Sequence, residues 1–487
     1  MREKGPFLFW LLFSCILLMA ILIIRPGWGL MDDTENLGFA KELLNSTNKL
    51  AAYNHFVYED ILGNGRFRPF YFVWIVSAYS LFHENPTGFY FFVLLLGLLF
   101  LPVWGKLLRD SYGKKYEGNS FVVWAYPVSF FLFTPFWNNF MYLSTLEKFI
   151  YFFSPLAFLS FLKVYQQRRF IPFIFAAGAG FFCLTSKETG IAVFMTFFIF
   201  CLISAVFCGS CRKLSIGLAV LNGTFLVGYY FLIRSIISGY SARYEGFSIP
   251  VIASHLIHGP AVIKLLFVFA VMSGSYFCWR AIKSGSVAEL FPVLWPFFVI
   301  TYLSVLSPWG YMNYLLAPLA PAVMAMFLPL YFSFWRTGKM KIIKDSLFGL
   351  ACALCLFGLI VPRILQLASV KEVSAFLKIA DVSSRYLFPA ASMETPVRLS
   401  ELSGKNIEYV KSGVITQKDL SGRSAYLILD PLCAGSDLID VRAEKIVYRT
   451  NYWVIIRIVP AIGSKRHYQV NFPQTFVQRF VRALKNY

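Results

Sequence analysis

Two adjacent carboxylates, Asp32 and Asp33, follow the first hydrophobic segment of the chain. A carboxylate in this position, beside a second acid, is suited to accept a proton from a hydroxyl group as a general base. The plainer interpretation is a solvated pair near the start of the next helix, where negative charge is favourable. The pair is a candidate catalytic site, and its residue types alone do not separate it from a helix cap.

Lys187 and Glu188 lie between two long apolar segments with almost no loop. Ionisable residues at the edge of a membrane are energetically costly and usually have a function. A lysine at this depth can bind a phosphate group as a point charge, with Glu188 orienting it. The alternative is a hairpin turn in which the two opposite charges neutralise each other.

Arg66 and Arg68 form a third polar island, meaning a short polar stretch beside apolar segments. They lie in the sequence Arg-Phe-Arg-Pro-Phe at 66–70. Two arginines suit a phosphate or diphosphate group, but basic and aromatic residues also anchor helices at the membrane interface. Glu147 precedes another apolar segment, where it is a candidate acceptor-binding acid or metal ligand, or a carboxylate at a helix start. The candidate phosphate-binding residues are Lys187, Glu188, Arg66 and Arg68.

The composition indicates which elements position these residues. The chain has 487 residues and is 58% hydrophobic and 19% aromatic but only 14% charged, with a mean hydropathy of +0.62. Soluble proteins carry about 25% charged residues. Apolar runs of roughly 20 residues recur, which is the length that crosses a bilayer as a helix. The predicted fold class is therefore an all-α polytopic membrane protein.

We expect about 11 transmembrane helices. They lie near residues 6–24, 89–105, 120–136, 148–164, 170–186, 190–207, 214–233, 260–279, 288–306, 313–334 and 345–362. The apolar stretch at 69–82 is a candidate re-entrant or interfacial helix. Alternate connections are short and rich in Lys and Arg, which is typical of cytoplasmic loops. This predicts a cytoplasmic N-terminus and an extracytoplasmic C-terminus, with all the candidate residues on the outer side.

Two regions are longer than simple connections. The first outer loop, residues 25–88, contains the acidic pair, and long loops in compact proteins are usually functional. After a membrane domain at 1–365, residues 366–487 have ordinary soluble composition, with strand-like runs at 425–429 and 452–456. We predict a small C-terminal extracytoplasmic α/β domain there. The formal net charge of +20 comes mainly from this tail and the cytoplasmic loops, and no nucleic acid is needed to explain it.

Three motifs, in this order, resemble the GT-C superfamily of membrane glycosyltransferases, of the protein O-mannosyltransferase and aminoarabinose transferase type. They are Asp32-Asp33, then Arg68-Pro69 followed by Asn85-Pro86-Thr87-Gly88-Phe89-Tyr90, and finally Ser186-Lys187-Glu188-Thr189-Gly190-Ile191. The chain has Tyr90 where the family has His, and Val93 where the family has Asn. The likeness extends to Ile191 and says little about the tail.

The resemblance implies transfer of a sugar from a polyprenyl-phosphate-linked donor to an acceptor hydroxyl at the outer face of the membrane. The acceptor would be an envelope glycan, a lipid or a protein, and the membrane a bacterial inner membrane. Asp32 matches the first acid of the family's pair and would be the base, with Asp33 orienting the acceptor or sharing a proton. A divalent cation such as Mg²⁺ or Mn²⁺ is compatible with the clustered acids, but no motif requires one, so the cofactor stays unassigned.

Other functions are weighed against this one. A flippase or transporter of lipid-linked saccharides would carry charges deep in several helices, or broken helices in two related halves. Here the charged candidates cluster at one membrane face and the halves are not evidently similar. An O-antigen-type polymerase would also use arginines in outer loops. A purely structural membrane protein is the third alternative.

Overall fold

The computed structural model describes most of the first half of the chain, a long helix near its C-terminal part and the final sheet. The described residues are 4–27, 33–64, 68–112, 119–140, 146–187, 190–237, 341–380, 384–389, 399–400, 403–410, 414–421, 423–429, 435–450 and 452–469, with isolated helical positions between 268 and 328. The segments expected at 260–279, 288–306 and 313–334 lie outside this description. The chain forms two compact units, one of residues 1–18, 37–84 and 91–352, the other of 19–36, 85–90 and 353–487.

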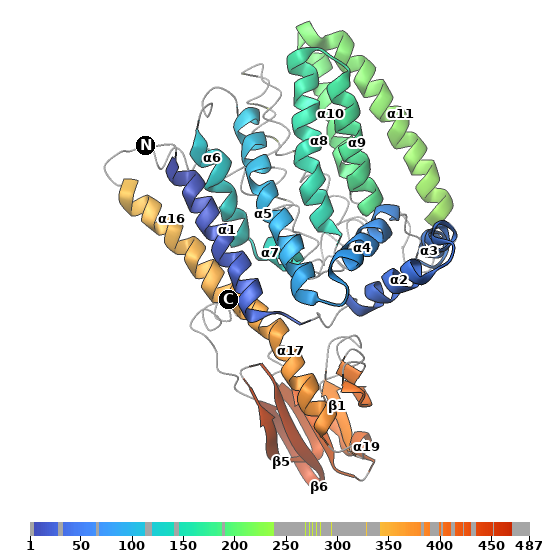
Figure 1. Ribbon diagram of the computed structural model, residues 1–487, viewed down its shortest axis with the longest axis vertical. Helices are drawn as coiled ribbons and strands as arrows, with labels where there is room; N and C mark the ends of the chain where they lie inside the picture. The colour runs from blue at the N-terminus through green and yellow to red at the C-terminus, as the bar shows by residue number, and fades with distance from the viewer. Residues whose placement is uncertain are drawn as a thin grey trace. The chain divides into compact units, whose positions relative to one another are not determined.

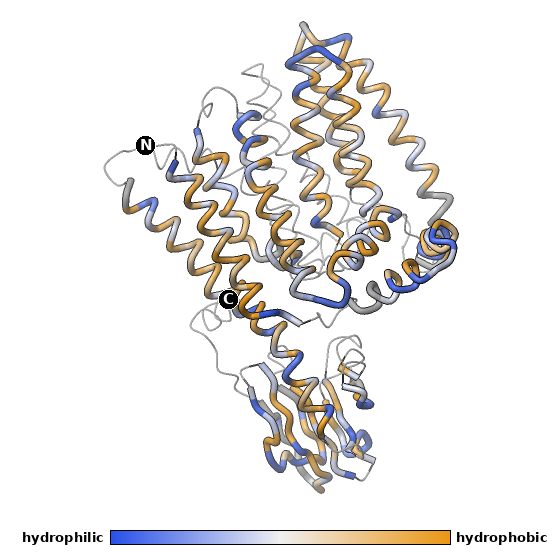
Figure 2. Tube along the Cα trace, viewed as in Figure 1, coloured by the Kyte–Doolittle hydropathy of each residue, from blue (hydrophilic) through white to orange (hydrophobic). Residues whose placement is uncertain are grey.

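The described part of the first unit, which we call the helical unit, consists of helices (Figure 1). The second unit also contains helical segments before its sheet. The helices are α1 (Lys4–Ile24), α2 (Asp33–Asn45), α3 (Lys49–Asn64), α4 (Pro69–Phe82), α5 (Pro86–Ser111), α6 (Ser120–Trp124), α7 (Thr134–Phe140), α8 (Glu147–Gln167), α9 (Ile171–Ser186), α10 (Ile191–Phe207), α11 (Arg212–Ile237), α16 (Lys341–Cys355) and α17 (Val361–Ile379). Figure 2 shows that α1, α5 and α8 to α11 are hydrophobic along most of their length.

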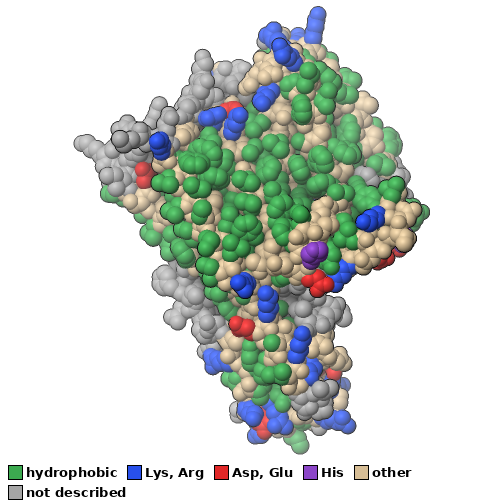
Figure 3. All heavy atoms as spheres, viewed as in Figure 1, with side chains coloured by type: hydrophobic (Ala, Val, Ile, Leu, Met, Phe, Trp, Pro, Cys, Tyr) green, Lys and Arg blue, Asp and Glu red, His purple; other side chains and the backbone are tan. Residues whose placement is uncertain are grey.

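Among the described residues, five helices are long and apolar enough to cross a membrane. They span Lys4–Ile24, Pro86–Ser111, Lys148–Gln167, Arg212–Leu232 and Ile343–Ile379. Shorter apolar helices at Ile171–Ser186 and Ile191–Phe207 coincide with two further predicted segments. The protein is thus a multi-pass helical membrane protein, as its apolar runs predict. On the helical unit, Figure 3 shows a broad hydrophobic surface with Lys and Arg side chains gathered at its upper end.

The segment expected as one helix at 120–136 is broken. It consists of the short helix α6, a 3₁₀ helix at Tyr126–Leu132, and the start of α7. Pro127 and Pro135 lack the backbone N–H that continues a helix, and the proline ring clashes with the preceding turn. The hydropathy of this stretch predicts its membrane location, but its two prolines determine its local structure.

Two prolines inside long helices leave carbonyl groups that tryptophans of neighbouring helices satisfy. Pro102 in α5 cannot bond the Leu98 carbonyl four residues earlier, and Trp10 Nε1 of α1 donates to that oxygen at 3.2 Å. Pro155 in α8 likewise leaves the Tyr151 carbonyl, which accepts from Trp104 Nε1 of α5 at 3.0 Å. Lipid offers no hydrogen-bond donors, so such carbonyls need partners within the protein. Each tryptophan therefore joins two helices at a proline.

The second unit contains a six-stranded mixed sheet with the order β2-β1-β4-β6-β5-β3. The strands are β1 (Arg385–Pro389), β2 (Ile407–Val410), β3 (Val414–Thr416), β4 (Ala425–Leu429), β5 (Gly435–Arg449) and β6 (Val454–Gln469). β1 pairs in parallel with β2 and β4, and β3 with β5, whereas β6 runs antiparallel to β4 and β5. The predicted C-terminal α/β domain is confirmed as a small sheet domain with helices. Its predicted boundary at 365/366 stays a prediction.

Helix α17 packs against one face of this sheet. Val370, Val373 and Leu377 of the helix lie in one buried cluster with Ile428 of β4 and Ile455 of β6. The opposite face has its own buried cluster, so β4 is apolar on both sides, with Leu427 and Leu429 pointing away from Ile428. Two hydrogen bonds fix the helix further. Trp453 Nε1 donates to Ser369 Oγ at 2.9 Å, and Lys405 Nζ to the Ala380 carbonyl at 2.7 Å.

The long helix that enters this domain contains one irregular turn. A π-helical turn at Leu356–Ile360 separates α16 from α17, and Pro362 is the second residue after it. Proline cannot bond the carbonyl four residues before it, and a widened turn accommodates the ring. Sequence and geometry therefore agree on where this helix departs from regular α-helix.

Candidate functional site

Residues 33–82, within the predicted first outer loop, contain three helices, α2, α3 and α4. Phe39 of α2, Phe56 of α3 and Phe72 of α4 form one aromatic cluster, with ring centroids 5.2 to 6.2 Å apart. Lys41 of α2 forms an exposed ion pair with Glu84, after α4, which adds little stability. Helix α4 has 14 residues and is therefore about 21 Å long, shorter than the roughly 30 Å of a bilayer core. This length fits the re-entrant or interfacial helix expected at 69–82.

Arg68 makes a two-pronged ion pair with Asp60. Its Nε lies 2.9 Å from Asp60 Oδ2 and its Nη2 2.7 Å from Oδ1, and the Asp60 side chain is only 4% exposed. The guanidinium also lies over the Tyr71 ring, 5.2 Å from its centroid. Tyr53 Oη donates to the Pro69 carbonyl at 3.0 Å, which holds the start of α4 against α3. Asp60, which sequence reasoning missed, thus orients an arginine that the sequence offers as either a candidate phosphate ligand or an interfacial anchor.

Phe70 brings the start of α4 together with α8 and α9. Its ring contacts Phe149 and Phe153 of α8 and Phe182 of α9 in edge-on arrangements, with centroids 5.3 to 5.7 Å apart. Such edge-to-face pairs are favoured by the charge distribution of aromatic rings. The contacts place the beginning of α4, the beginning of α8 and the end of α9 at one end of the helical unit.

Polar residues adjoin each of these aromatic contacts. Arg68 precedes Phe70 by two residues, Glu147 precedes Phe149 by two, and Lys187 follows Phe182 by five. Lys148, at the start of α8, is fully buried. The Phe70 contacts therefore bring the helix ends that carry Arg68, Lys148 and Lys187 to the same end of the helices. Nothing in the sequence distinguishes Lys148 from other basic residues, because its burial depends on the neighbouring helices.

The turn after Ser186 is short and tightly packed. The Lys187 N–H donates to the Cys183 carbonyl at 3.1 Å and the Gly190 N–H to the Lys187 carbonyl at 2.8 Å, while the Lys187 side chain is half-buried. A Cβ atom on Gly190 would overlap the Cys183 carbonyl group and lie 2.5 Å from the Leu184 nitrogen. Glycine is therefore required for α10 to start so close to α9. Backbone hydrogen bonds thus hold Lys187 on both sides, through its own N–H and its carbonyl.

The acidic pair is only partly described. Asp33 is the first residue of α2, although its side chain, like that of Glu147, is not described, and Asp32, Arg66 and Glu188 lie outside the described residues. The chain just before the pair is attached to α17. The Gly27 N–H donates to the Leu367 carbonyl at 3.1 Å, and Lys371 Nζ donates to the Arg25 carbonyl at 3.2 Å.

Gly27 is required at this contact. A Cβ atom there would lie 2.9 Å from the Leu367 carbonyl oxygen and 3.2 Å from Lys371 Cγ. A larger residue would force the segment away from the helix, and both hydrogen bonds would lengthen. The C-terminal helix therefore anchors the chain that leads into the acidic pair.

The described residues contain no group of three or more His, Cys, Asp or Glu side chains placed to hold a metal ion. The described cations at this end of the helices are Arg68, which is paired with Asp60, Lys148, which is buried, and Lys187, which is half-buried. Lysine and arginine are the residue types that bind anionic groups.

No protein-family model and no curated protein sequence match the chain. Among solved structures, it is similar to ArnT from Cupriavidus metallidurans, in a crystal structure with bound undecaprenyl phosphate. The two share 13% sequence identity over 92% of this chain and 97% of that one, with a TM-score of 0.44. At this sequence identity and TM-score, the likeness does not indicate an activity for this chain.

Proposed function

We propose that the protein is a membrane glycosyltransferase that transfers a sugar from a polyprenyl-phosphate-linked donor to an acceptor hydroxyl. The proposal is supported by the ring contacts of Phe70, which bring the start of α4, the first turns of α8 and the end of α9 to one end of the helices, together with the polar islands that contain Arg68, Lys148 and Lys187. Two of these islands contain the motifs that resemble the GT-C superfamily. Positive charge at the end of apolar helices suits a ligand with an anionic head and a long apolar tail.

In the proposed reaction, Lys187 holds the donor phosphate, with Glu188, Arg66 and Arg68 completing its surroundings. Asp32 takes the proton of the acceptor hydroxyl, whose oxygen forms a bond to the anomeric carbon. The bond from that carbon to the phosphate oxygen breaks, and polyprenyl phosphate leaves with the electron pair. Positive charge near the phosphate stabilises the charge that develops on it.

Further side chains have supporting roles in this proposal. Asp60 would keep the Arg68 guanidinium in one orientation, because both of its oxygens are engaged by the arginine. Asp33 would orient the acceptor, and Glu147 would contact it from the start of α8. The reaction would take place at the outer face of a bacterial inner membrane, with the N-terminus in the cytoplasm and the C-terminal domain outside.

The test uses Asp32→Asn in the purified full-length protein, with the acceptor first identified by mass spectrometry of envelope glycans and lipids from cells with and without the gene. Asparagine keeps the size of the side chain but cannot take up the proton. Transfer should slow by roughly 10²- to 10⁴-fold, the usual effect of losing a general base. Donor binding should persist, since a negative charge has been removed.

Asp33→Asn is the matched control for this experiment. Full transfer by Asp32→Asn with an inactive Asp33→Asn would reverse the roles of the two acids. Full transfer by both variants would remove the pair from the mechanism. A flippase needs no base, so movement of intact donor across the membrane by the Asp32→Asn variant, without any transfer in the wild type, would favour that alternative.

A further inference from the structure

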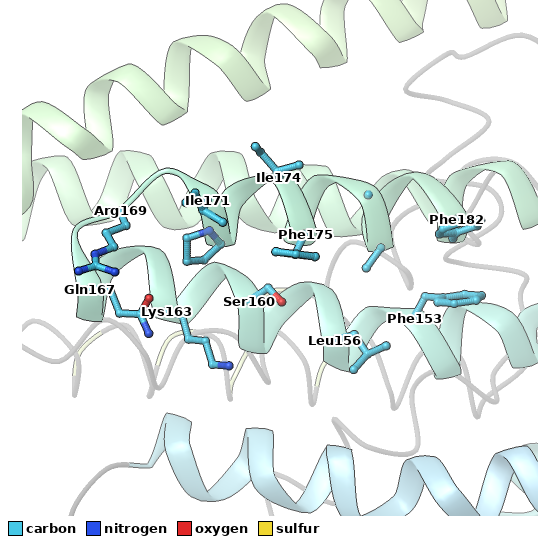
Figure 4. Close-up of a pocket in the computed structure, with 13 residues that line it drawn as sticks. Phe153, Leu156, Ser160, Lys163, Gln167, Arg169, Ile171, Ile174, Phe175 and Phe182 are labelled. Carbon is cyan, nitrogen blue, oxygen red and sulfur yellow. The ribbon is translucent and has the colours of Figure 1, made fainter.

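A groove of about 650 Å³ runs between α8 and α9 and ends at Phe153 and Phe182, two of the rings that contact Phe70 (Figure 4). Lys163, Gln167 and Arg169 line one end of it, and Phe153 and Phe182 line the other (Figure 4). From Phe153 to Gln167 the groove follows α8 for about 21 Å, at 1.5 Å per residue. Its volume lies within the range of small-molecule binding sites.

The middle and far end of the groove are apolar. Ile174 is 58% exposed, Phe175 66% and Phe182 44%, and Leu156 of α8 lies opposite them. Gly178 also lines the groove, with no atom within 4 Å of the position where a Cβ would be. Apolar side chains exposed on a membrane helix face hydrocarbon, so this part of the groove suits an alkyl chain.

The other end of the groove is cationic. Lys163 and Arg169 are exposed there, beside the amide of Gln167, which can both donate and accept hydrogen bonds. Two cations next to an apolar channel complement a ligand that has an anionic head and a hydrocarbon chain. A basic pocket between membrane helices is a recurrent form of lipid headgroup site.

We propose that this groove is a binding site for an anionic phospholipid. Lys163 and Arg169 would contact the phosphate, and an acyl chain would lie along Leu156, Phe175 and Phe182. The cationic end of the groove is distinct from the proposed donor phosphate site, because Arg169 precedes the first residue of α9 while Lys187 follows its last. The short basic connection at 168–170 is also predicted to be cytoplasmic, where anionic phospholipids give the membrane surface a negative potential.

The test measures lipid binding to the purified full-length protein by native mass spectrometry. The probes are phosphatidylglycerol, phosphatidylcholine with the same acyl chains, and a polyprenyl phosphate. The wild type should bind phosphatidylglycerol more tightly than phosphatidylcholine. The double variant Lys163→Gln, Arg169→Gln should weaken phosphatidylglycerol binding by about tenfold or more and leave phosphatidylcholine binding unchanged.

Two further variants separate the groove from general surface charge. Arg212→Gln, Lys213→Gln removes two exposed cations that lie at the start of α11 and do not line the groove, so phosphatidylglycerol binding should persist. Gly178→Trp should fill the apolar channel without displacing protein atoms at its Cβ, and should weaken binding while both cations are still present.

Three results would overturn the proposal. The first is a wild type with no preference for phosphatidylglycerol over phosphatidylcholine. The second is an equal loss of binding in the Arg212, Lys213 variant, which would indicate attraction to the whole basic surface. The third is tighter, groove-dependent binding of polyprenyl phosphate, which would make the groove a carrier site. None of these measurements depends on glycosyl transfer, so the proposed function is tested separately.

Discussion

Single side chains join the membrane helices at positions that hydropathy does not reveal. Trp10 and Trp104 each donate a hydrogen bond to a carbonyl that lies four residues before a proline of another helix. Hydrogen bonds between membrane helices contribute about 0.6 kcal/mol on average and up to about 1.7 kcal/mol. Each hydrogen bond therefore offsets part of the energetic cost of a proline inside a membrane helix. Each also links two helices, α1 with α5 and α5 with α8.

We expect Trp10→Phe to lower the free energy of unfolding by about 1 kcal/mol, because the Leu98 carbonyl loses its donor. In a Pro102→Ala background the residue at 102 regains an N–H that can bond Leu98, so the same tryptophan change should cost less. A double-mutant cycle by reversible unfolding in SDS measures the difference. Equal effects of Trp10→Phe in both backgrounds would show that the tryptophan acts through packing alone.

Lys187 offers a second test at this scale. Lys187→Ala should raise the KM for the lipid-linked donor by roughly 10- to 100-fold, as expected for the loss of a charged hydrogen bond. The turn should survive, because its hydrogen bonds use the backbone of Lys187. Lys187→Arg should restore part of the donor affinity, and Lys213→Ala is a control at a distant exposed lysine. Wild-type kinetics in both Lys187 variants would favour the neutral hairpin turn.

Sequence reasoning identifies some residues of the candidate site and misses others for physical reasons. Arg68 and Lys187 stand out because charges are rare beside long apolar runs. Asp60 does not stand out, because its role is to pair with Arg68. The two residues are eight positions apart, and they meet only because the chain turns between α3 and α4. The burial of Lys148 likewise depends on packing between helices, which no single stretch of sequence encodes.

At the scale of elements, length and hydropathy predict most of the described membrane helices well. Backbone N–H and C=O groups in lipid must bond to each other, and a helix does this within one segment. A long apolar run in a membrane is therefore helical. The prediction fails at 120–136, where prolines break the run, and it gives no secondary structure for the aqueous part of the 25–88 loop. Helices α2 and α3 are less apolar, and they are stabilised by contacts such as Phe39 with Phe56.

The α9–α10 hairpin gives a prediction for an element. Gly190→Ala should destabilise the protein and weaken donor use, since the new methyl group would meet the Cys183 and Leu184 backbone, which cannot move aside as a side chain can. Gly178→Ala is the matched control in the same helix pair, where the methyl group meets no atom within 4 Å and alanine favours helix by about 1 kcal/mol. Thermal unfolding of the two purified variants makes the comparison. Similar stability of both would contradict the close approach of α10 to α9.

The sidedness of the whole molecule decides which chemistry is available to it. An active site on the outer face has no access to cytosolic nucleotide sugars, which is why a lipid-linked donor fits the proposal. The predicted orientation depends on Lys and Arg at the ends of the apolar helices, such as Lys106 and Arg109 near the end of α5 and Arg212 and Lys213 at the start of α11.

We expect a reporter fused after Tyr487 to be extracytoplasmic and one fused after Lys114 to be cytoplasmic. Paired alkaline phosphatase and green fluorescent protein fusions at each position make the measurement, because the first is active only outside and the second fluoresces only inside. A cytoplasmic tail would rule out the proposed mechanism, since the acidic pair and the tail are assigned by the same alternation of segments.

The attachment of the Arg25–Gly27 segment to α17 also has a consequence for biosynthesis. Lys371 and Arg25 are 346 residues apart in the chain, although they share a hydrogen bond. At a synthesis rate of roughly 5–20 residues per second, α17 emerges about 17–70 s after the segment it holds. During that interval the stretch that leads into Asp32 has already been synthesised, but it lacks its hydrogen-bond partner in α17. The segment before the acidic pair can therefore be held by α17 only after the ribosome has passed Lys371 of the 487-residue chain.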